Sequence, residues 1–392
     1  MGSIKGIRDK VAIIGMGCTK FGEHWDKSKN DLIYEATRDA LIDAKMETKD
    51  IEAAWAGTWV SGFDGRCLAD PLKLQYIPVT RVENACASGS DAFRNACYAV
   101  AAGAYDICLA VGFEKLKDSG WSGLPDQQSL PNNRYPDRTA PGMFALMATT
   151  YFSKYKLSPE EGKRMIGLIS VKSHHNGTLN PRAHLRREVT IEQVMNAPIV
   201  AWPLGLFDCC GVSDGAAAAI VCRADMAKKY RPDPVYVKAL QISVCPSEGE
   251  MRSDYDFTTV KATVRAGEAA YQEAGIKNPR EEISMAELHD CFSITEAVTC
   301  EDLNFSPKGK VKKDIESGFF NLDGKLPVQP DGGLKSFGHP IGASGVRMLF
   351  EMYLQLQGKA DKRQLKNPKL GLTHNLGGIP VSNTVSVLII GR

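Results

Sequence analysis

One cysteine stands where the geometry of a helix could make a thiol nucleophilic. Cys86 lies in segment 83–89, just before a run of small and apolar residues that stops at Gly103. Such a run is typical of a closely packed helix, whose N-terminal N–H groups and dipole favour a thiolate and so lower the pKa of the thiol. The alternative is a buried, inert cysteine, because cysteine is among the most buried residue types. The other polar segments have to decide between these interpretations.

Three segments in the second half of the chain carry histidines in apolar surroundings. His289 follows a predicted strand and precedes Cys291 by two residues, His339 precedes a predicted helix, and His374 follows the predicted strand 370–373. A single histidine is more often structural or solvated. Three at equivalent strand ends are harder to explain in that way, and a cysteine with positioned histidines is the arrangement that activates a sulfur nucleophile.

The composition is that of an ordinary soluble enzyme. The 392 residues are 43% hydrophobic and 24% charged, with a formal charge of +2 and no basic block, which excludes nucleic acid as the expected partner. The longest apolar runs, 107–113 and 216–222, are far shorter than the ~20 residues of a membrane-spanning helix. No signal peptide is visible. We therefore expect a cytoplasmic protein without a membrane partner.

The cysteine pattern also bears on compartment and metal content. The eleven cysteines are scattered, odd in number and partly inside apolar runs, which is typical of a reducing compartment. No Cys-x-x-Cys pair occurs, and the seven histidines add no ligand spacing beside one. The sequence therefore predicts no metal site within this chain.

The first half alternates strand and helix signals. Residues 11–17 predict a buried strand and a glycine turn, but Lys20 replaces the third glycine of a dinucleotide-binding fingerprint and no helix opens there, so no such site is expected. A helix at 31–44, a short strand at 51–59 and a buried strand at 107–113 follow.

The second half repeats the order of the first. A pattern Ala-x3-Ala-x-Met begins at Ala40, its counterpart Ala-x3-Ala-x-Ile begins at Ala270, and a strand follows each at nearly the same spacing. Strands are also predicted at 235–244 and 384–390, and a helix at 342–358 corresponds to the helix after the candidate cysteine. Each half is then a unit of alternating strands and helices whose loop ends converge at one place.

The composition of the sequence changes between residues 114 and 203, where Gly, Pro, Asn, Asp and Arg are frequent and no pattern predicts a strand. A segment this long is functional or disordered, and its methionines and aromatic residues argue for a lid or a binding wall. The predicted fold class is α/β, with an N-terminal half at 1–113 and 204–228, an inserted loop domain at 114–203 and a C-terminal half at 229–392.

Taken together, these segments resemble the thiolase family, in particular its sterol-carrier-protein-x-like branch with bacterial and archaeal relatives, over nearly the entire chain. The resemblance rests on the order and spacing of six motifs: Asn84-Ala85-Cys86-Ala87-Ser88-Gly89, Asn180-Pro181-x-Ala183, Asp214-Gly215-Ala216-Ala217, His289-Asp290-Cys291-Phe292, Gly338-His339-Pro340 and His374-Asn375-Leu376-Gly377. It implies a thiolase-like fold of two related βαβαβ-type halves in a five-layered α-β-α-β-α arrangement.

The resemblance also implies residue roles. Cys86 would take the acyl group after His339 removes its proton. His289, with a water and His339, would form the oxyanion hole for the thioester enolate, and the backbone N–H groups of Cys86 and Gly377 would form a second hole for the tetrahedral intermediate. The implied reaction is thiolytic cleavage of a 3-oxoacyl-CoA or the reverse Claisen condensation, with coenzyme A as substrate and no tightly bound cofactor.

The sequence departs from the family pattern at one position. Many thiolases carry a second cysteine in a Cys-x-Gly motif near the C-terminus, which exchanges a proton with the substrate α-carbon. Here no cysteine follows Cys300, and Asn375-Leu376-Gly377 occupies that place. His374 and Cys291 are the candidates for the missing acid/base. The departure leaves open a decarboxylating condensing enzyme of the ketoacyl-synthase or hydroxymethylglutaryl-CoA-synthase kind.

Coenzyme A is expected to lie against the inserted segment. Arg182, Arg186 and Arg187 are candidates for its phosphates, and Met143 for the pantetheine or acyl part. The alternative for arginines in a loop is a solvated surface that needs no partner.

The resemblance implies two kinds of protein partner. A homodimer is expected because sheet edges beside the nucleophile segment pair across a two-fold axis in thiolases. Thiolases of this branch that lack a fused lipid-carrier domain resemble those that pair with a small zinc-ribbon and OB-fold protein, so a subunit active only with such a partner is a further alternative. Nothing in the sequence selects the acyl group, which could be aliphatic or aromatic, as in benzoylsuccinyl-CoA.

Overall fold

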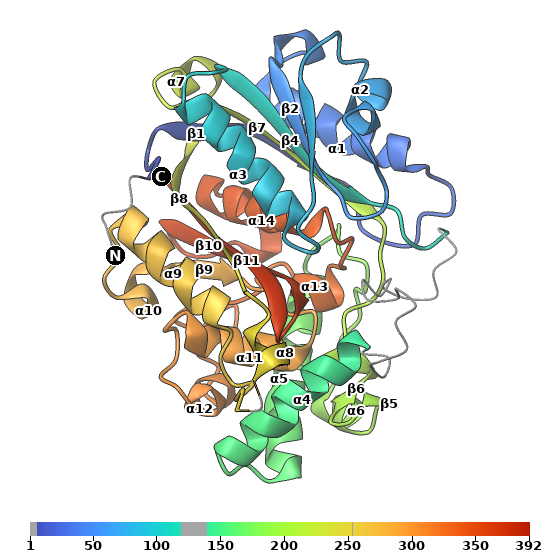
Figure 1. Cartoon of the computed structure of the whole chain (residues 1–392), viewed down its shortest axis with the longest axis vertical. Coiled ribbons are helices and arrows are strands. Elements are labelled where there is room, and N and C mark those ends of the chain that lie inside the picture. The colour runs from blue at the N-terminus through green and yellow to red at the C-terminus, as the bar shows by residue number, and fades with distance from the viewer. Residues whose placement is uncertain (1–5, 119–138, 253) are drawn as a thin grey trace.

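The first half of the chain places its strands and helices as the hydrophobic pattern predicts (Figure 1). The structure is a computed structural model that describes residues 6–118, 139–252 and 254–392. The elements of the first half are β1 (Val11–Cys18), α1 (Lys29–Ala44), β2 (Ala53–Gly57), α2 (Arg66–Leu72), β3 (Val79–Val82), α3 (Ser88–Ala101), β4 (Ile107–Glu114), β7 (Gly215–Arg223) and α7 (Ala227–Tyr230). The short edge strand β3 had no signal in the sequence, because its four residues are exposed or half-buried.

The second half contains the same kinds of element in the same order. They are β8 (Val235–Val244), α8 (Glu248–Met251), α9 (Lys261–Ala274), α10 (Pro279–Glu282), β9 (Met285–Glu287), α11 (Ser293–Asp302), α12 (Val311–Glu316), α13 (Gly333–Ser336), α14 (Ser344–Gln357), β10 (Leu370–Ile379) and β11 (Ser382–Gly391). One boundary was wrong. The strand expected at 370–373 continues to Ile379, because residues 374–379 stay extended and pair with β11.

The strand order confirms the internal repeat. One sheet runs β3-β2-β4-β7-β1-β8-β11-β10-β9, so the order β2-β4-β7-β1 of the first half matches β9-β10-β11-β8 of the second. The directions also match, since β2 and β4 are parallel, as are β9 and β10, and the remaining neighbours are antiparallel. Within the sheet, β1 and β8 join the two halves through the pairs Ala12 with Tyr236 and Ile13 with Val235.

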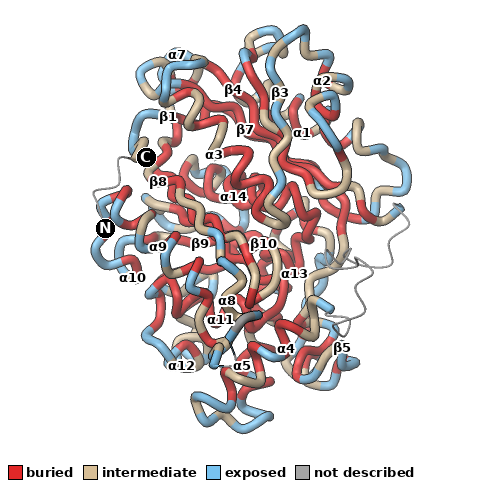
Figure 2. Tube along the Cα trace, viewed as in Figure 1, coloured by how far each residue is buried: buried red, intermediate tan, exposed pale blue. Residues whose placement is uncertain are grey.

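Three hydrophobic cores separate five layers, which confirms the predicted α-β-α-β-α arrangement. Along β1 the side chains alternate, so that Ala12 and Ile14 face α1 while Val11 and Ile13 face the central layer, as the period of two in a strand requires. The central core lies between the two half-sheets and contains the inner faces of α3 and α14. The third core lies under α9 and α11. In Figure 2 the buried trace runs through both halves.

The run of small residues after the candidate cysteine is explained by the central layer. Helices α3 and α14 lie against each other there. A Cβ at Gly89 would lie 2.3 Å from the carbonyl oxygen of Gly342, and one at Gly345 would lie 2.2 Å from Ser90 Oγ. These positions need glycine because the backbones approach so closely.

The inserted segment is mostly helical where it is described. Its helices are α4 (Ala140–Lys154), α5 (Pro159–Thr178) and α6 (Ile191–Met195), followed by the ribbon of β5 (Ile199–Ala201) and β6 (Leu204–Gly205). The first turn of α5 carries a capping box between Ser158 and Glu161. Residues 119–138 of the predicted insertion lie outside the described residues. Phe144 of α4 stacks on Phe292, with ring centroids 4.6 Å apart, so the insertion packs directly on the segment that carries His289.

Within the described residues, no helix combines the length and the hydropathy needed to cross a membrane.

Candidate active site

The centre of the site is a contact between the two halves of the chain. Cys86 lies between β3 and α3, on a loop that Ala85 bends with a φ of +47°. His339 lies between α13 and α14, and its Nε2 is 3.2 Å from Cys86 Sγ. The pair joins residues 253 positions apart in the sequence. The predicted meeting of these two segments is therefore present in the fold.

A serine fixes which nitrogen of His339 faces the sulfur. Ser344 Oγ lies 2.8 Å from His339 Nδ1 and donates its own hydrogen to the carbonyl oxygen of Pro340 at 3.1 Å. Because a carbonyl can only accept, the serine oxygen is left to accept from Nδ1–H. The hydrogen-bond network thus assigns the proton to Nδ1, and Nε2 presents a lone pair to the thiol.

The sequence prediction for the pKa of Cys86 was wrong in sign. Burial raises the pKa of the Cys86 thiol to about 12, and the Glu114 carboxylate adds to the increase. The helix N-terminus does not reverse this direction, because α3 starts at Ser88, two residues after the cysteine. Burial likewise lowers the pKa of His339 to about 3, with Arg347 as a second cause. The resting pair is therefore a neutral thiol beside a neutral imidazole.

His289 completes a compact group with that pair. Its ring centroid lies 5.2 Å from that of His339 at an interplanar angle of 78°, and its Nδ1 has no hydrogen-bond partner in the described part of the chain. One ligand atom each from Cys86, His289 and His339 lies within 4.8 Å of the others, a spacing that could also hold a soft cation. We interpret the group as acid–base machinery, because the Cys86 sulfur and His339 Nε2 are at hydrogen-bond distance.

His374 positions His289 and does not face the cysteine. Its Nε2 lies 3.0 Å from Thr263 Oγ1, and its Nδ1 accepts from the backbone N–H of His289 at 3.5 Å. Both ring nitrogens are therefore occupied. Burial lowers the pKa of His374 to about 3. This geometry does not favour His374 as the acid/base at the substrate α-carbon, and the reason is that β10 remains a strand where the sequence suggested a turn.

Cys291 is the candidate thiol that lies near the nucleophile. It is buried, and burial raises its pKa well above the ordinary value, with Cys210 and Cys86 as further causes. The backbone N–H of Cys210 donates to the carbonyl oxygen of Cys291 at 2.8 Å, so these two cysteines lie side by side. Cys210 follows Cys209 in a pair that the sequence analysis left unused.

Two adjacent glycines approach the nucleophile in different ways. The backbone N–H groups of Gly378 and of Cys86 itself lower the pKa of the Cys86 thiol and so partly oppose the effect of burial. Gly377, which the sequence singled out, lies against the nucleophile loop, where a Cβ would be 2.2 Å from the carbonyl oxygen of Asn84.

Sequence reasoning also missed two residues that hold the turn before α14. Ser344 lies five residues after His339, a spacing that could have indicated it. The buried carboxylate of Glu114 accepts from the N–H groups of Trp59, Val60, Ser61 and Gly342, and so ties this turn to the first half. Nothing in the sequence around Glu114 predicts those partners, because three of them lie on a loop more than 50 residues away.

The candidate coenzyme A residues are not one cluster. Arg182 points inward, where its Nε donates to the carbonyl oxygen of Cys18 at 2.8 Å and its guanidinium lies 5.5 Å from the ring of Phe350. Arg186 and Arg187 are exposed. Met143 is buried on α4. Arg182 therefore helps to pack the insertion against β1, whereas the side chains of the two exposed arginines face solvent.

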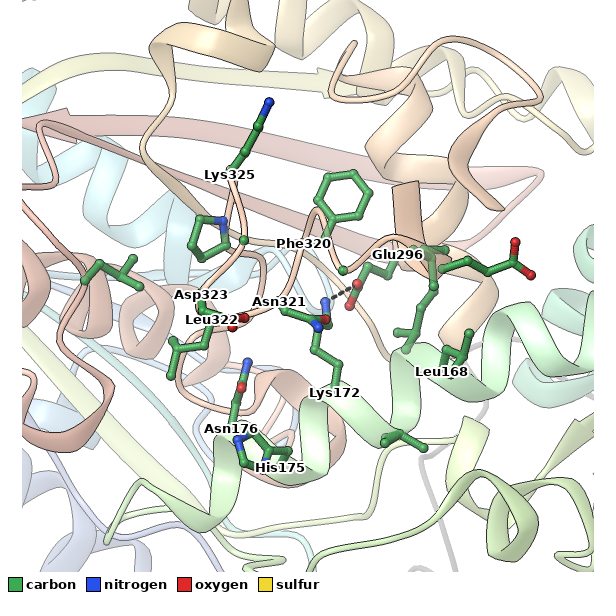
Figure 3. A pocket seen from close by; sticks show the side chains of 18 of the residues that line it. Leu168, Lys172, His175, Asn176, Glu296, Phe320, Asn321, Leu322, Asp323 and Lys325 are labelled. Atoms are coloured by element: carbon green, nitrogen blue, oxygen red, sulfur yellow. Dashed lines mark hydrogen bonds and ion pairs between the residues drawn. The ribbon is translucent and has the colours of Figure 1, made fainter. Parts of the chain in front are cut away.

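A cleft of about 870 Å³ lies apart from these residues, between α5 and the loop before α13 (Figure 3). The ion pair between Lys172 and Glu296 lies at its centre. None of the candidate catalytic residues lines this cleft.

Comparison with known families identifies the family to which the chain belongs. A family model described as "Thiolase, N-terminal domain" matches residues 11–225, and one described as "Thiolase C-terminal domain-like" matches residues 246–390. The chain is therefore an enzyme of the acyltransferase class. It belongs to the thiolase family, which confirms the resemblance seen in its motifs. Because both halves match thiolase models, the alternative of a decarboxylating condensing enzyme is not favoured.

Individual relatives agree with this assignment. An "Acetyl-CoA acetyltransferase" of Methanothermobacter thermautotrophicus is 41% identical, covering 97% of this chain and 99% of the relative. The "Benzoylsuccinyl-CoA thiolase subunit BbsB" of Thauera aromatica is 31% identical, covering 94% and 95%. A solved structure described as "Ltp2-ChsH2(DUF35) aldolase" shares the fold, with a TM-score of 0.84 at 24% identity and 98% coverage of both chains.

Proposed function

We propose that the protein cleaves a 3-oxoacyl-CoA with coenzyme A, or runs the reverse condensation, through an acyl group carried on Cys86. The observation that supports this most directly is the 3.2 Å contact between Cys86 Sγ and His339 Nε2. His339 accepts the thiol proton as the sulfur attacks the 3-oxo carbon. Because both groups are neutral at rest, the ion pair forms only during attack, where donors in a water-poor site stabilise it most.

Cys291 supplies the proton at the α-carbon in this proposal. When the bond between the α-carbon and the 3-oxo carbon breaks, its electron pair becomes the enolate of the departing acyl-CoA. The Cys291 thiol protonates that α-carbon and becomes a thiolate. Coenzyme A then enters as a thiol, gives its proton to the Cys291 thiolate and attacks the acyl group on Cys86, which releases the second acyl-CoA. The protonated His339 returns its proton to the departing Cys86 sulfur, so that all three groups regain their resting state.

Two sets of donors stabilise negative charge. His289 faces the enolate oxygen with a ring that has a free Nδ1 and a backbone held by His374. The backbone N–H groups of Cys86 and Gly377 are the proposed donors to the oxyanion of the tetrahedral intermediate, since Gly377 lies against the loop that carries Cys86. Preorganised donors of this type are each worth about 3–4 kcal/mol of barrier.

The central test is acyl transfer to Cys86. Incubation with acetyl-CoA or an acetoacetyl thioester should add one acyl group to the intact protein, and Cys86→Ala should abolish this, while Cys300→Ser, a change at another buried cysteine, should not. Detection of the acyl group on the Cys86→Ala protein would contradict the proposal.

The substrate is a coenzyme A thioester whose acyl part is set by the insertion. The names of the two sequence relatives suggest acetyl and aromatic acyl groups, so we propose a panel of aliphatic and aromatic 3-oxoacyl-CoA esters. We propose Arg186 and Arg187 as contacts for the phosphates of coenzyme A and Met143 for its pantetheine. Unchanged affinity after neutralising both arginines would exclude the phosphate contact.

We also propose a cytoplasmic homodimer that works with a small zinc-ribbon and OB-fold subunit. Support comes from the word "subunit" in the name of one relative and from the DUF35 protein named together with the similar solved structure. Sedimentation of the protein alone and with a co-expressed candidate subunit, followed by assays of both, tests this. Full activity of the isolated chain would exclude an obligatory partner.

A further inference from the structure

Lys335 is a buried ammonium group that forms no ion pair with any of the described residues. Its residue is 1% exposed, and its Nζ donates to the backbone carbonyl oxygen of Asp208 at 2.7 Å. In the described part of the chain no carboxylate oxygen lies within 4.0 Å of that nitrogen. The other two buried lysines of this region differ, since Lys163 pairs with the carboxylate of Asp208 and Lys172 with that of Glu296. The nearby carboxyl of Asp290 feels this charge, since Lys335 lowers its pKa, but the two groups form no direct ion pair. A buried charge without a direct ion pair is costly, so its retention calls for a role.

Two short segments place thiols beside this ammonium. The backbone N–H of Cys210 donates to the carbonyl oxygen of Cys291 at 2.8 Å, next to an antiparallel bridge between Cys209 and Phe292. Cys210 and Cys291 are therefore cross-strand neighbours, whose side chains leave on the same face. Because Lys335 Nζ is held at residue 208, at the start of one of these segments, the ammonium lies at the edge of the thiol pair.

Helix α13 is held against the same place from its other end. The backbone N–H of Leu334 donates to Asp290 Oδ1 at 2.7 Å, directly before Cys291 in the sequence. Lys335 is thus fixed between residue 208 on one side and residue 290 on the other. Its ammonium donates to a backbone carbonyl, and the backbone N–H before it donates to a side-chain carboxylate.

We propose that Lys335 is a positioning residue for proton transfer at the substrate α-carbon, and that its ammonium stabilises the thiolate form of Cys291. This inference rests on the proposed function, in which Cys291 is the acid/base. In the condensation direction the Cys291 thiolate takes a proton from the α-carbon and the electron pair moves to the thioester oxygen as an enolate. In the cleavage direction the same steps run backwards.

The charges around Cys291 show why a cation is needed there. Burial is the main cause that raises the pKa of Cys291, and Cys210, Cys86 and Asp290 act in the same direction. Lys335 is the cation that opposes them, and it also lowers the pKa values of Cys209 and Cys210. His174, which also faces the ammonium, is buried and its pKa is lowered, mainly by burial. Without the ammonium, a thiolate at Cys291 would have only neutral and acidic neighbours.

The test separates the two half-reactions. Exchange of the methyl protons of acetyl-CoA in D2O, followed by mass spectrometry, reports on the α-carbon, while acylation of Cys86 by the same thioester reports on the nucleophile. We expect Lys335→Met and Lys335→Gln to slow exchange by about 10-fold or more, because one charged neighbour shifts a pKa by roughly 1–3 units. Acylation should be unchanged, and Lys335→Arg should retain exchange.

The variants distinguish charge from packing. Lys335→Gln can keep a hydrogen bond to the Asp208 carbonyl but loses the charge, so exchange at the wild-type rate in this variant would overturn the inference. A charge effect also moves the pH midpoint of exchange upward in Lys335→Gln, whereas a purely structural role leaves the midpoint in place, and an unmoved midpoint would overturn it as well. These readouts stand even if Lys335→Met does not fold.

A different set of results would show that the proposed function, and not only the role of Lys335, is wrong. Cys291→Ser should abolish exchange while Cys300→Ser leaves it intact. If Cys291→Ser exchanges normally, or the wild type does not exchange at all, the assignment of Cys291 is wrong. If Cys291→Ser loses exchange but Lys335→Gln does not, the proposed function stands and only the role of Lys335 fails.

Discussion

Removal of one hydroxyl next to His339 should slow acylation without altering the nucleophile. Ser344→Ala deletes the oxygen that accepts from His339 Nδ1 at 2.8 Å. When His339 takes the thiol proton it becomes an imidazolium, and a hydrogen bond to a charged group contributes about 1.5–3 kcal/mol. At roughly 1.36 kcal/mol per tenfold change in rate, we expect acylation to be about 10- to 150-fold slower. The loss also frees the other tautomer, which would point N–H at the sulfur.

Rapid-quench measurement of acyl-enzyme formation from acetyl-CoA reports this step directly. Ser306→Ala is the matched control, because Ser306 is also buried and its hydroxyl also donates a hydrogen bond, in this case to Asp314, away from the site. Equal unfolding free energies of the two variants would separate catalysis from stability. Acylation by Ser344→Ala at the wild-type rate would refute the reasoning that Ser344 orients and stabilises His339.

Three further results are expected. The rate at which iodoacetamide alkylates Cys86 should rise from pH 7 through pH 9 without a plateau, because burial raises its pKa to about 12; a plateau in this range would indicate a resting thiolate. Burial lowers the pKa of His374 from 6.5 to about 3, so the unfolded chain binds the extra proton first and the free energy of unfolding should fall as the pH drops through that window. Denaturant titrations should show a smaller loss for His374→Gln, and an equal loss would exclude this contribution. Gly377→Ala should reduce acyl transfer strongly, since its Cβ would displace the Asn84 carbonyl, and near-normal turnover would show that the loop yields.

Much of the architecture could be predicted from the sequence, because each half repeats the same periodic pattern of apolar residues. The strand at 235–244 was predicted at its observed bounds, and α1 begins within two residues of its expected start. The edge strand β3 lacked a signal because its exposed side chains do not alternate in polarity. The position of His374 inside a strand was not predicted either, because only the pairing of β10 with β11 shows that the strand continues past this residue.

The site was predicted less completely because its chemistry depends on long-range partners. The motifs identified Cys86 and His339 but could not reveal that burial outweighs the helix dipole in setting the thiol pKa. Arg182 resembles a phosphate ligand in a loop, yet its guanidinium contacts a backbone carbonyl 164 residues away. Lys335 was passed over for the same reason, because a lysine beside a glycine turn gives no hint of burial.

The separation of 253 residues between nucleophile and base has a consequence for biosynthesis. A ribosome completes the strand and helix that flank Cys86 long before His339 emerges, and the base enters only with the last quarter of the chain. Until then the thiol has no imidazole beside it, so acyl transfer assisted by His339 begins only after both halves have docked. Base-assisted reaction of Cys86 with thioesters is thereby tied to completion of the central layer.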